Sequence, residues 1–369
     1  MTTALPPPAI VQPAAYEVSY GLVTGTAPPG TQRLLVRAGS RLLAGRPLGG
    51  RHFTVRVQLP LHETSVFVVA VSADGRRSTA RVDHVLGLPR AGAPVARAPR
   101  LDPRLAAEIR RLTAGFAGSA AVYVQSLADG RGAAWNARAR FPAGSTLKLA
   151  IAVAVLSRTG ELPPPDSYVG RLLRQMLVVS DNDAANALEV WLAGSTGAGG
   201  RVVDVLMRSL GLDDTIMYGG YLHGTSLGSE IPLQAVDQPA LTLGKRTSAR
   251  DLAWLLRDVW LASGGRGALR TRFPGFSAGD ARHLLYLLAH VRDRGKIDRQ
   301  IGEAPGIRVL HKGGWINAAR HDNALVFWRG GVFVVTVMTY RAAGAGRSSD
   351  VLAGRVAATA LRRFAHVAT

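Results

Sequence analysis

The sequence contains no cysteine, and this absence excludes both disulfides and thiolate metal sites. Long hydrophobic runs are missing too, since none reaches the roughly 18–20 residues that a membrane-spanning helix needs. The first residues, Met-Thr-Thr-Ala-Leu-Pro-Pro-Pro, carry neither a basic nor an apolar segment, so no signal peptide is visible. Composition alone therefore leaves the compartment open.

Acidic residues are few: 25 of them face 45 lysines and arginines, which gives a formal net charge of +20. A protein with such a charge could bind nucleic acid, an anionic cell envelope or an acidic membrane surface. The arginines are spread along the chain without a helix-turn-helix, zinc-finger or arginine–aromatic motif. We therefore expect no nucleic-acid partner and keep an anionic envelope surface as a candidate partner.

The length of 369 residues suits two or three domains, and 47% hydrophobic residues can fill a sizeable core. Residues 1–15 are rich in proline and alanine and predict a flexible lead-in. Residues 16–86 contain short Val-, Leu- and Phe-rich segments with strand-like alternation, which predicts a small all-β sandwich. Residues 87–100 read as a linker, and residues 101–369 as the second domain.

The second domain has an α+β pattern. Strands are expected at residues 120–127 and 133–136, then several helices, then strands at 307–311, 324–328 and 332–340 before a final helix. This order predicts one antiparallel sheet built from both ends of the domain, with a helical subdomain inserted between them.

Lysine is scarce, and one of only four lysines begins an apolar helical run three residues after a serine. Because a helical turn takes about 3.6 residues, Ser145 and Lys148 should share a face. A neutral lysine can take the proton of a serine hydroxyl, whereas arginine does not deprotonate in proteins. The alternative is a helix start with a solvated lysine, since Ser-x-x-Lys alone is a weak motif.

Two further segments bear polar groups suited to a site. Ser180-Asp-Asn follows a helical segment and could either position a hydroxyl and an amide or simply cap a helix. Lys312-Gly-Gly-Trp follows a predicted strand and could either let a substrate lie against the backbone or form a hairpin turn.

Together and in this order, the three motifs resemble those of the penicillin-recognising serine hydrolases, most closely the class A β-lactamases. The resemblance covers residues 101–369 and implies a β-lactamase/transpeptidase-like fold. The segments Thr247-Ser-Ala-Arg-Asp-Leu-Ala and Asp322-Asn-Ala-Leu-Val-Phe are also similar to family segments. Residues 16–86 resemble bacterial Ig-like modules, which space or dock catalytic domains.

The resemblance implies a role for each residue that matches a family motif. Ser145 would be the acylated nucleophile, Lys148 its base, and Ser180 the proton relay to the leaving nitrogen. Lys312 would orient Ser180 and attract an anionic substrate, and Asn182 would bind the substrate amide. Substrate would also contact Gly313, Gly314 and Trp315, with the backbone N–H groups of Ser145 and Trp315 forming the oxyanion hole. No metal or cofactor is expected.

The sequence also departs from the family pattern. The deacylating Glu-x-x-x-Asn loop is absent between residues 210 and 232, where Glu230 is the one glutamate and hence the only candidate deacylation base. Gly313 replaces the threonine of Lys-Thr-Gly, and only 35 positions separate Ser145 from Ser180, fewer than is usual in the family.

We therefore expect a serine hydrolase whose default activity is β-lactam hydrolysis, and with it antibiotic resistance, and we expect the missing Glu-x-x-x-Asn loop to slow this hydrolysis. A D,D-peptidase or esterase acting on cell-wall peptides and a penicillin-binding scaffold without hydrolysis are the alternatives. The family resemblance implies export to the cell envelope.

Overall fold

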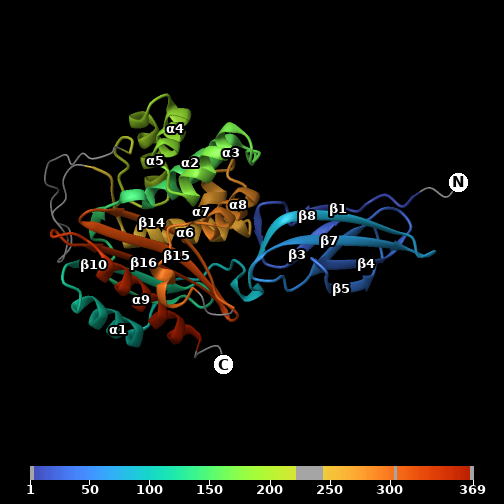
Figure 1. The fold of residues 1–369 in the computed structure, drawn as a ribbon, viewed down its shortest axis with the longest axis horizontal. Coiled ribbons are helices and arrows are strands. Elements are labelled where there is room, and N and C mark those ends of the chain that lie inside the picture. The colour runs from blue at the N-terminus through green and yellow to red at the C-terminus, as the bar shows by residue number, and fades with distance from the viewer. Residues whose placement is uncertain (1–3, 222–243, 303–305, 366–369) are drawn as a thin grey trace. The chain divides into compact units, whose positions relative to one another are not determined.

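The structure is a computed structural model that describes residues 4–221, 244–302 and 306–365. The chain forms two compact units, residues 1–93 and residues 94–369 (Figure 1). The second unit thus begins within the stretch that the sequence suggested as a linker. None of the helices in the described ranges combines the length and hydrophobicity of a transmembrane segment.

The first unit consists of strands, as expected, arranged in two sheets. One sheet has the strand order β1-β3-β6 and the other the order β2-β8-β7-β4-β5. Their bounds are β1 Ala9–Gln12, β2 Glu17–Ser19, β3 Leu22–Thr26, β4 Thr31–Ala38, β5 Arg41–Pro47, β6 His52–Arg56, β7 Glu63–Ser72 and β8 Arg77–Gly87. A short 3₁₀ turn, η1 Arg90–Gly92, follows the last strand.

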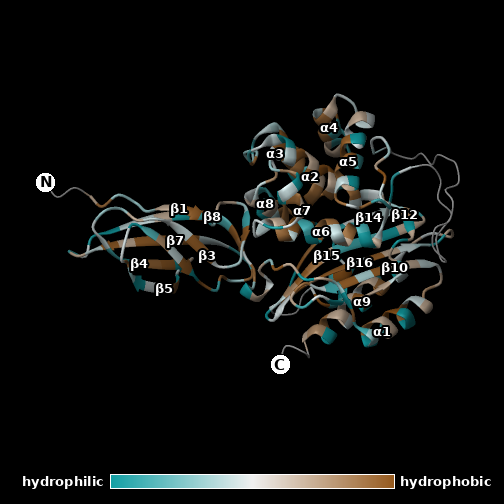
Figure 2. Cartoon of the chain, turned by 180° about the vertical axis from the view of Figure 1, so that it is seen from behind, coloured by the Kyte–Doolittle hydropathy of each residue, from teal (hydrophilic) through white to brown (hydrophobic). Residues whose placement is uncertain are grey.

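The alternation that predicted strands also builds the core of this unit. Phe53, Val55 and Val57 are buried on one side of the chain while the residues between them are exposed. Hydrophobic colour on β7 marks the same core (Figure 2). One expectation is corrected: residues 9–12, within the predicted flexible lead-in, pair with β3.

Strands β2 and β3 are separated by a short break at residues 20 and 21. Gly21 has a φ of 81°, and a Cβ built there would lie 1.9 Å from the carbonyl oxygen of Val57. The chain can therefore cross so close to β6 only at a residue without a side chain.

The second unit contains the predicted sheet made from both ends of the domain. Its strand order is β14-β15-β16-β10-β11-β9, antiparallel except for the short β9–β11 pair. The bounds are β9 Arg100–Leu101, β10 Ser119–Ser126, β11 Arg131–Trp135, β14 Arg308–Ile316, β15 Ala319–Trp328 and β16 Gly331–Tyr340. A separate two-stranded sheet pairs β12 Arg140–Pro142 with β13 Arg246–Ser248. Strand β14 lies at an edge of the six-stranded sheet.

Helices cover both faces of this sheet (Figure 1). Helices α1 Pro103–Ala114 and α9 Arg347–Ala365 enclose a hydrophobic core against one face. The remaining helices are α2 Lys148–Thr159, α3 Tyr168–Val178, α4 Asn182–Ala193, α5 Thr196–Ser209, α6 Ala249–Ser263, α7 Ala268–Arg272 and α8 Ala278–Ala289. Of these, α6 and α8 contact the sheet, and α2 contacts α3, α4 and α5. The α+β architecture expected from the sequence is confirmed.

Candidate active site

Ser145 lies in the 3₁₀ turn η2 Gly144–Leu147, which runs directly into α2. Two glycines let strand β14 approach this turn. A Cβ built at Gly314 would lie 2.8 Å from the backbone nitrogens of Ser145 and Thr146, and one built at Gly144 would lie 3.0 Å from the backbone nitrogen of Trp315. The backbone N–H groups that sequence reasoning suggested as an oxyanion hole therefore belong to two segments in close contact.

Lys148 is fully buried, and its ammonium points to the segment that links α3 and α4. Its Nζ donates to the carbonyl oxygen of Ser180 at 2.5 Å and to Oδ1 of Asn182 at 2.6 Å. The Oγ of Ser180 is 3.5 Å from the same nitrogen. Ser145 forms no side-chain hydrogen bond within the ranges that the structure describes, so its hydroxyl is uncommitted.

A second lysine reaches Ser180 from the sheet. Nζ of Lys312, on β14, donates to Oγ of Ser180 at 2.8 Å and to the carbonyl oxygen of Gly313 at 2.9 Å. The Ser180 hydroxyl therefore lies between Lys148 and Lys312. Residues that are far apart in sequence thus form one hydrogen-bonded group.

The segment Ser180-Asp-Asn combines the two interpretations that its sequence allowed. Asp181 is the N-cap of α4, and its carboxylate accepts a hydrogen bond from the backbone nitrogen of Ala184 at 2.7 Å. Ser180 adopts a φ of 62°, which is uncommon for a residue with a side chain. The capped helix and the unusual backbone angle hold the Ser180 hydroxyl and the Asn182 amide toward Lys148.

Burial and like charge lower the pKa values of both lysines. The pKa of Lys148 falls from 10.5 to about 7, mainly because burial penalises the charged form and secondarily because Lys312 repels it. The pKa of Lys312 falls to about 8, again mainly through burial, although Asp293 and Asp322 favour its charged form. Near neutral pH, Lys148 is thus uncharged for much of the time and Lys312 is mostly charged.

A third lysine lies beside Gly313, at a position that no sequence motif marks. Lys296 is buried, and its ammonium forms an ion pair with Asp293. A Cβ built at Gly313 would lie 3.2 Å from both the Lys296 Nζ and an Asp293 carboxylate oxygen. The glycine therefore leaves room for an ion pair that a larger residue would crowd.

The fourth lysine belongs to a buried cluster behind Lys148. The ring of Tyr221 lies between two ammonium groups, 4.7 Å from Nζ of Lys148 and 4.5 Å from Nζ of Lys245. Asn186 on α4 fixes this tyrosine through two hydrogen bonds to its backbone, at 2.6 and 2.9 Å. The cluster thus places an aromatic ring, rather than a carboxylate, against Lys148.

Glu189 is fully buried on the same helix, and neither of its carboxylate oxygens has a hydrogen-bond partner within the described ranges. Burial raises its pKa from 4.5 to about 8, and Lys245 opposes this only in part. Glu189 is therefore protonated at neutral pH. Sequence reasoning missed both Glu189 and Tyr221, because a lone residue on a helix or loop carries no local signal.

His311, next to Lys312 in sequence, belongs to a different group of residues. Its ring is fully buried, and Nδ1 lies 2.9 Å from one carboxylate oxygen of Asp322 on β15. The other oxygen of Asp322 accepts a hydrogen bond from the backbone nitrogen of Ile297 at 3.1 Å. The pair thus ties β14, β15 and the turn η3 Ile297–Gln300 together beneath the site.

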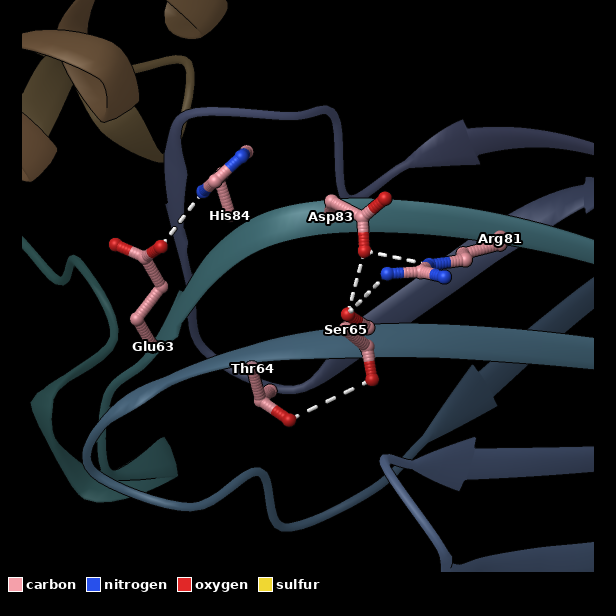
Figure 3. Close-up of a pocket in the computed structure, with 6 residues that line it drawn as sticks. All are labelled: Glu63, Thr64, Ser65, Arg81, Asp83 and His84. Carbon is pink, nitrogen blue, oxygen red and sulfur yellow. Dashed lines mark hydrogen bonds and ion pairs between the residues drawn. The ribbon is translucent and has the colours of Figure 1, made fainter.

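The first unit also has a polar pocket, lined by Glu63, Thr64, Ser65, Arg81, Asp83 and His84 (Figure 3). Its charged groups are paired with each other. Arg81 contacts Asp83 at 2.6 Å, and His84 contacts Glu63 at 2.7 Å. The pocket shows no hydroxyl held between cations of the kind found around Ser180.

The region that contains this site has recognisable relatives. The sequence model of the β-lactamase enzyme family matches residues 104–162 and 157–364. The chain belongs to the β-lactamase enzyme family. No curated protein matches the chain in sequence.

Solved structures with the same fold include several β-lactamases. A β-lactamase from Streptosporangium roseum is 19% identical with a TM-score of 0.56, covering 72% of this chain and 99% of its own. An ancestral class A β-lactamase is 21% identical with a TM-score of 0.55, covering 70% and 100%. A mutant of PBP-A, solved as an acyl-enzyme complex with penicillin G, is 20% identical with a TM-score of 0.55, covering 73% and 99%.

In this β-lactamase family member, most of the site residues that the motifs suggested lie within the residues that the structure describes. Ser145, Lys148, Ser180, Asn182, Lys312, Gly313, Gly314 and Trp315 all lie within them. Glu230, the candidate deacylation base, lies outside the described residues. Within those residues, no carboxylate forms a hydrogen bond with Ser145, Lys148 or Ser180.

Proposed function

We propose that this protein is a serine hydrolase that opens β-lactams or related cell-wall amides through an acyl-enzyme at Ser145, and that it releases the acyl group slowly. The observation that carries the proposal is the position of the Ser180 hydroxyl between two buried lysines, 2.8 Å from one and 3.5 Å from the other. Family membership and the penicillin G adduct of a PBP-A mutant with the same fold support it.

Acylation would begin with neutral Lys148, which takes the proton of Ser145 Oγ as that oxygen attacks the substrate carbonyl carbon. The C–N bond breaks when the tetrahedral intermediate collapses. Ser180 gives its proton to the leaving nitrogen and is reprotonated by Lys148. The net result is the loss of one proton from Ser145 and the gain of one by the leaving amine, while Lys148 returns to its neutral form and Lys312 keeps its charge throughout.

The developing oxyanion would be stabilised by the backbone N–H groups of Ser145 and Trp315, which the Gly144 and Gly314 contacts bring together. Each such donor is typically worth about 3–4 kcal/mol in the transition state. The close contact between the turn and β14 requires glycine at both Gly144 and Gly314. This requirement explains why the second glycine of the Lys312-Gly-Gly-Trp motif has no side chain.

An anionic substrate would be held by Lys312, with help from Lys296 beside Gly313. At position 313 there is no threonine hydroxyl, and the Lys296–Asp293 pair lies directly against the glycine. The charge of Lys312 favours a carboxylate, as found on penicillins and on peptide C-termini.

Slow release is supported by the residues around Lys148 in the part of the chain that the structure describes, which excludes Glu230. Hydrolysis of the ester requires a base that activates water. The side chain packed against Lys148 is the Tyr221 ring, and the nearby buried carboxyl, Glu189, is protonated at neutral pH because burial raises its pKa. Neither group can take a proton from water near pH 7.

The test is to incubate the protein with a fluorescent penicillin, measure intact mass, and follow nitrocefin turnover in parallel. We expect an adduct on the wild-type protein that persists for minutes or longer, and none on Ser145→Ala. Ser40→Ala, which changes an exposed serine of the first unit, is the matched control and should label normally.

Three other outcomes would change the conclusion. Rapid turnover without a lasting adduct would overturn slow release and point to an efficient β-lactamase. Turnover of D-alanyl-D-alanine peptides with weak penicillin labelling would favour the D,D-peptidase alternative. Equal labelling of Ser145→Ala and the wild-type protein would overturn Ser145 as the nucleophile.

A further inference from the structure

His321, on strand β15, lies against the chain segment that leads to the candidate nucleophile. Its side chain is buried, and its Nε2 donates a hydrogen bond of 2.7 Å to the carbonyl oxygen of Pro142. Pro142 ends strand β12 and precedes Ser145 by three residues. The proposed acylation chemistry assigns no role to this histidine, and no sequence motif marks it.

The register of the sheet places the His321 side chain next to the proposed oxyanion hole. His321 pairs directly with Gly314 on strand β14, and opposite residues of an antiparallel pair point to the same face of a sheet. A Cβ built at Gly314 would lie 2.8 Å from the backbone nitrogen of Ser145. One cross-strand pair therefore contacts this segment twice, at Pro142 through a hydrogen bond and at Ser145 through close packing.

Other hydrogen bonds of the same segment run elsewhere. Strand β12 pairs with β13, and the backbone nitrogen of Ala143 donates to the carbonyl oxygen of Lys245 at 2.9 Å. Both partners lie outside the six-stranded sheet to which β14 belongs. The hydrogen bond from His321 therefore ties the backbone before Ser145 to that sheet, and so to the strand that carries the Trp315 N–H.

The partners of the imidazole fix its proton and its orientation. The backbone N–H of Thr339 on β16 donates to Nδ1 at 3.2 Å, while the Pro142 carbonyl can only accept, so the proton of the neutral ring lies on Nε2. Burial lowers the pKa of His321 to about 4, which keeps the ring neutral near pH 7. The ring of Phe141 meets the imidazole edge to face, with ring centroids 5.8 Å apart. The imidazole is thus held in one orientation in which both of its nitrogens are used.

We propose that His321 is a positioning residue that sets the separation between the two N–H groups of the oxyanion hole. It does so by holding the backbone before Ser145 at a fixed distance from the sheet that carries Trp315. The inference rests on the proposed function, which places the developing oxyanion between these N–H groups. Because removal of one such donor slows catalysis about 100- to 1,000-fold, partial misplacement of one donor should slow it about tenfold.

Two substitutions separate the two hydrogen bonds of the ring. His321→Gln keeps an amide N–H at a reach similar to that of Nε2, so the bond to Pro142 can form. His321→Asn is shorter, so its amide oxygen can accept from Thr339 but its N–H should not reach Pro142. Val326→Ala is the control for lost stability, because Val326 lies on the same strand and belongs to the core that α1 and α9 enclose.

Each variant is labelled with fluorescent penicillin at several concentrations, which yields a binding constant and an acylation rate constant. We expect His321→Asn to acylate about tenfold more slowly than the wild type with a binding constant within about twofold, because the oxyanion forms only on the way to the acyl-enzyme. His321→Gln should recover at least about half of the wild-type rate constant. Val326→Ala should acylate within about twofold of the wild-type rate, although its thermal unfolding shows a lower melting temperature.

The outcomes distinguish this inference from the proposed function. Absence of an adduct on the wild-type protein would overturn both, whereas an adduct that forms equally fast on His321→Asn would overturn the inference alone. Equal slowing by all three substitutions is the pattern of a residue that only stabilises the fold, and it would also overturn the inference. An effect confined to the binding constant would do the same. If His321→Asn does not fold, His321→Met takes its place with the same expected rate, because it has similar bulk and no N–H donor.

Discussion

The acylation rate of Ser145 should follow a bell-shaped pH profile whose maximum lies between pH 7 and pH 8. The acidic limb reports Lys148, which must be neutral to accept the serine proton, and burial together with Lys312 lowers its pKa to about 7. The alkaline limb reports Lys312, whose charge attracts the substrate carboxylate and whose pKa is about 8. An isolated lysine, with a pKa of 10.5, would give no maximum in this range.

The size of the effect follows from these two values. At pH 6, about one-tenth of Lys148 is neutral, and at pH 9 about one-tenth of Lys312 is charged. At pH 7 and 8, the fraction of molecules with both lysines in the required state is about 0.45. Acylation should therefore be about fivefold slower at pH 6 and at pH 9 than between pH 7 and 8. Because the two groups interact, the measured limbs belong to the pair.

The assay is stopped-flow or quenched labelling with an excess of penicillin, at constant ionic strength, from pH 5.5 to 10. Lys312→Arg serves as the informative variant, because arginine keeps its charge throughout this range. It should lower the overall rate by misplacing Ser180 and should abolish the alkaline limb. A wild-type rate that keeps rising to pH 10 would refute the reasoning, since Lys148 would then behave as a solvated lysine.

Three further predictions concern stability, packing and the first unit. Glu189 keeps its proton in the folded state up to about pH 8, so between pH 4.5 and pH 8 it should lower the free energy of unfolding of the wild-type protein by about 3–5 kcal/mol relative to that of Glu189→Gln; identical pH dependence of the two proteins in urea titrations would contradict this. Gly314→Ala should slow acylation at least about 100-fold, because the new Cβ would meet the backbone nitrogens of Ser145 and Thr146. Gly346→Ala is the control, because the new Cβ there has open space around it; equal acylation rates for the two variants would argue against the close contact at Gly314. Removal of residues 1–93 should leave acylation of Ser145 within about twofold, and a lost adduct would show that the first unit does more than space or dock the second.

The motifs predicted several of the residues that the fold brings together around Ser180, because each motif is short and has local geometry. A serine and a lysine three residues apart share one face of a helix, regardless of where the fold places that helix. An aspartate directly before a helix caps the helix, whether or not neighbouring residues are catalytic. Asp102, Asp181 and Ser248 all cap helices in the structure. Local rules were sufficient for these elements.

The rest of the site depends on tertiary contacts that no local pattern encodes. Tyr221 faces Lys148 because Asn186 holds its backbone, and Lys296 faces Gly313 because the turn after α8 packs under β14. The strand at residues 9–12 was missed for a related reason. Its proline- and alanine-rich surroundings favour a flexible segment, and only pairing with β3 makes it a strand.

The choice of lysine over arginine is explained by the same contacts. Of 45 basic residues only four are lysines. One of them, Lys148, performs the proposed proton transfer, and each of the other three acts electrostatically on Lys148 or on Lys312. Lys245 and Lys312 lower the pKa of Lys148, and Lys296 lowers that of Lys312. Arginine at any of these positions would stay charged and would present a larger planar group to a site with little free space. A chain that otherwise uses arginine for its positive charge therefore keeps lysine where a proton must leave or where a compact charge must fit.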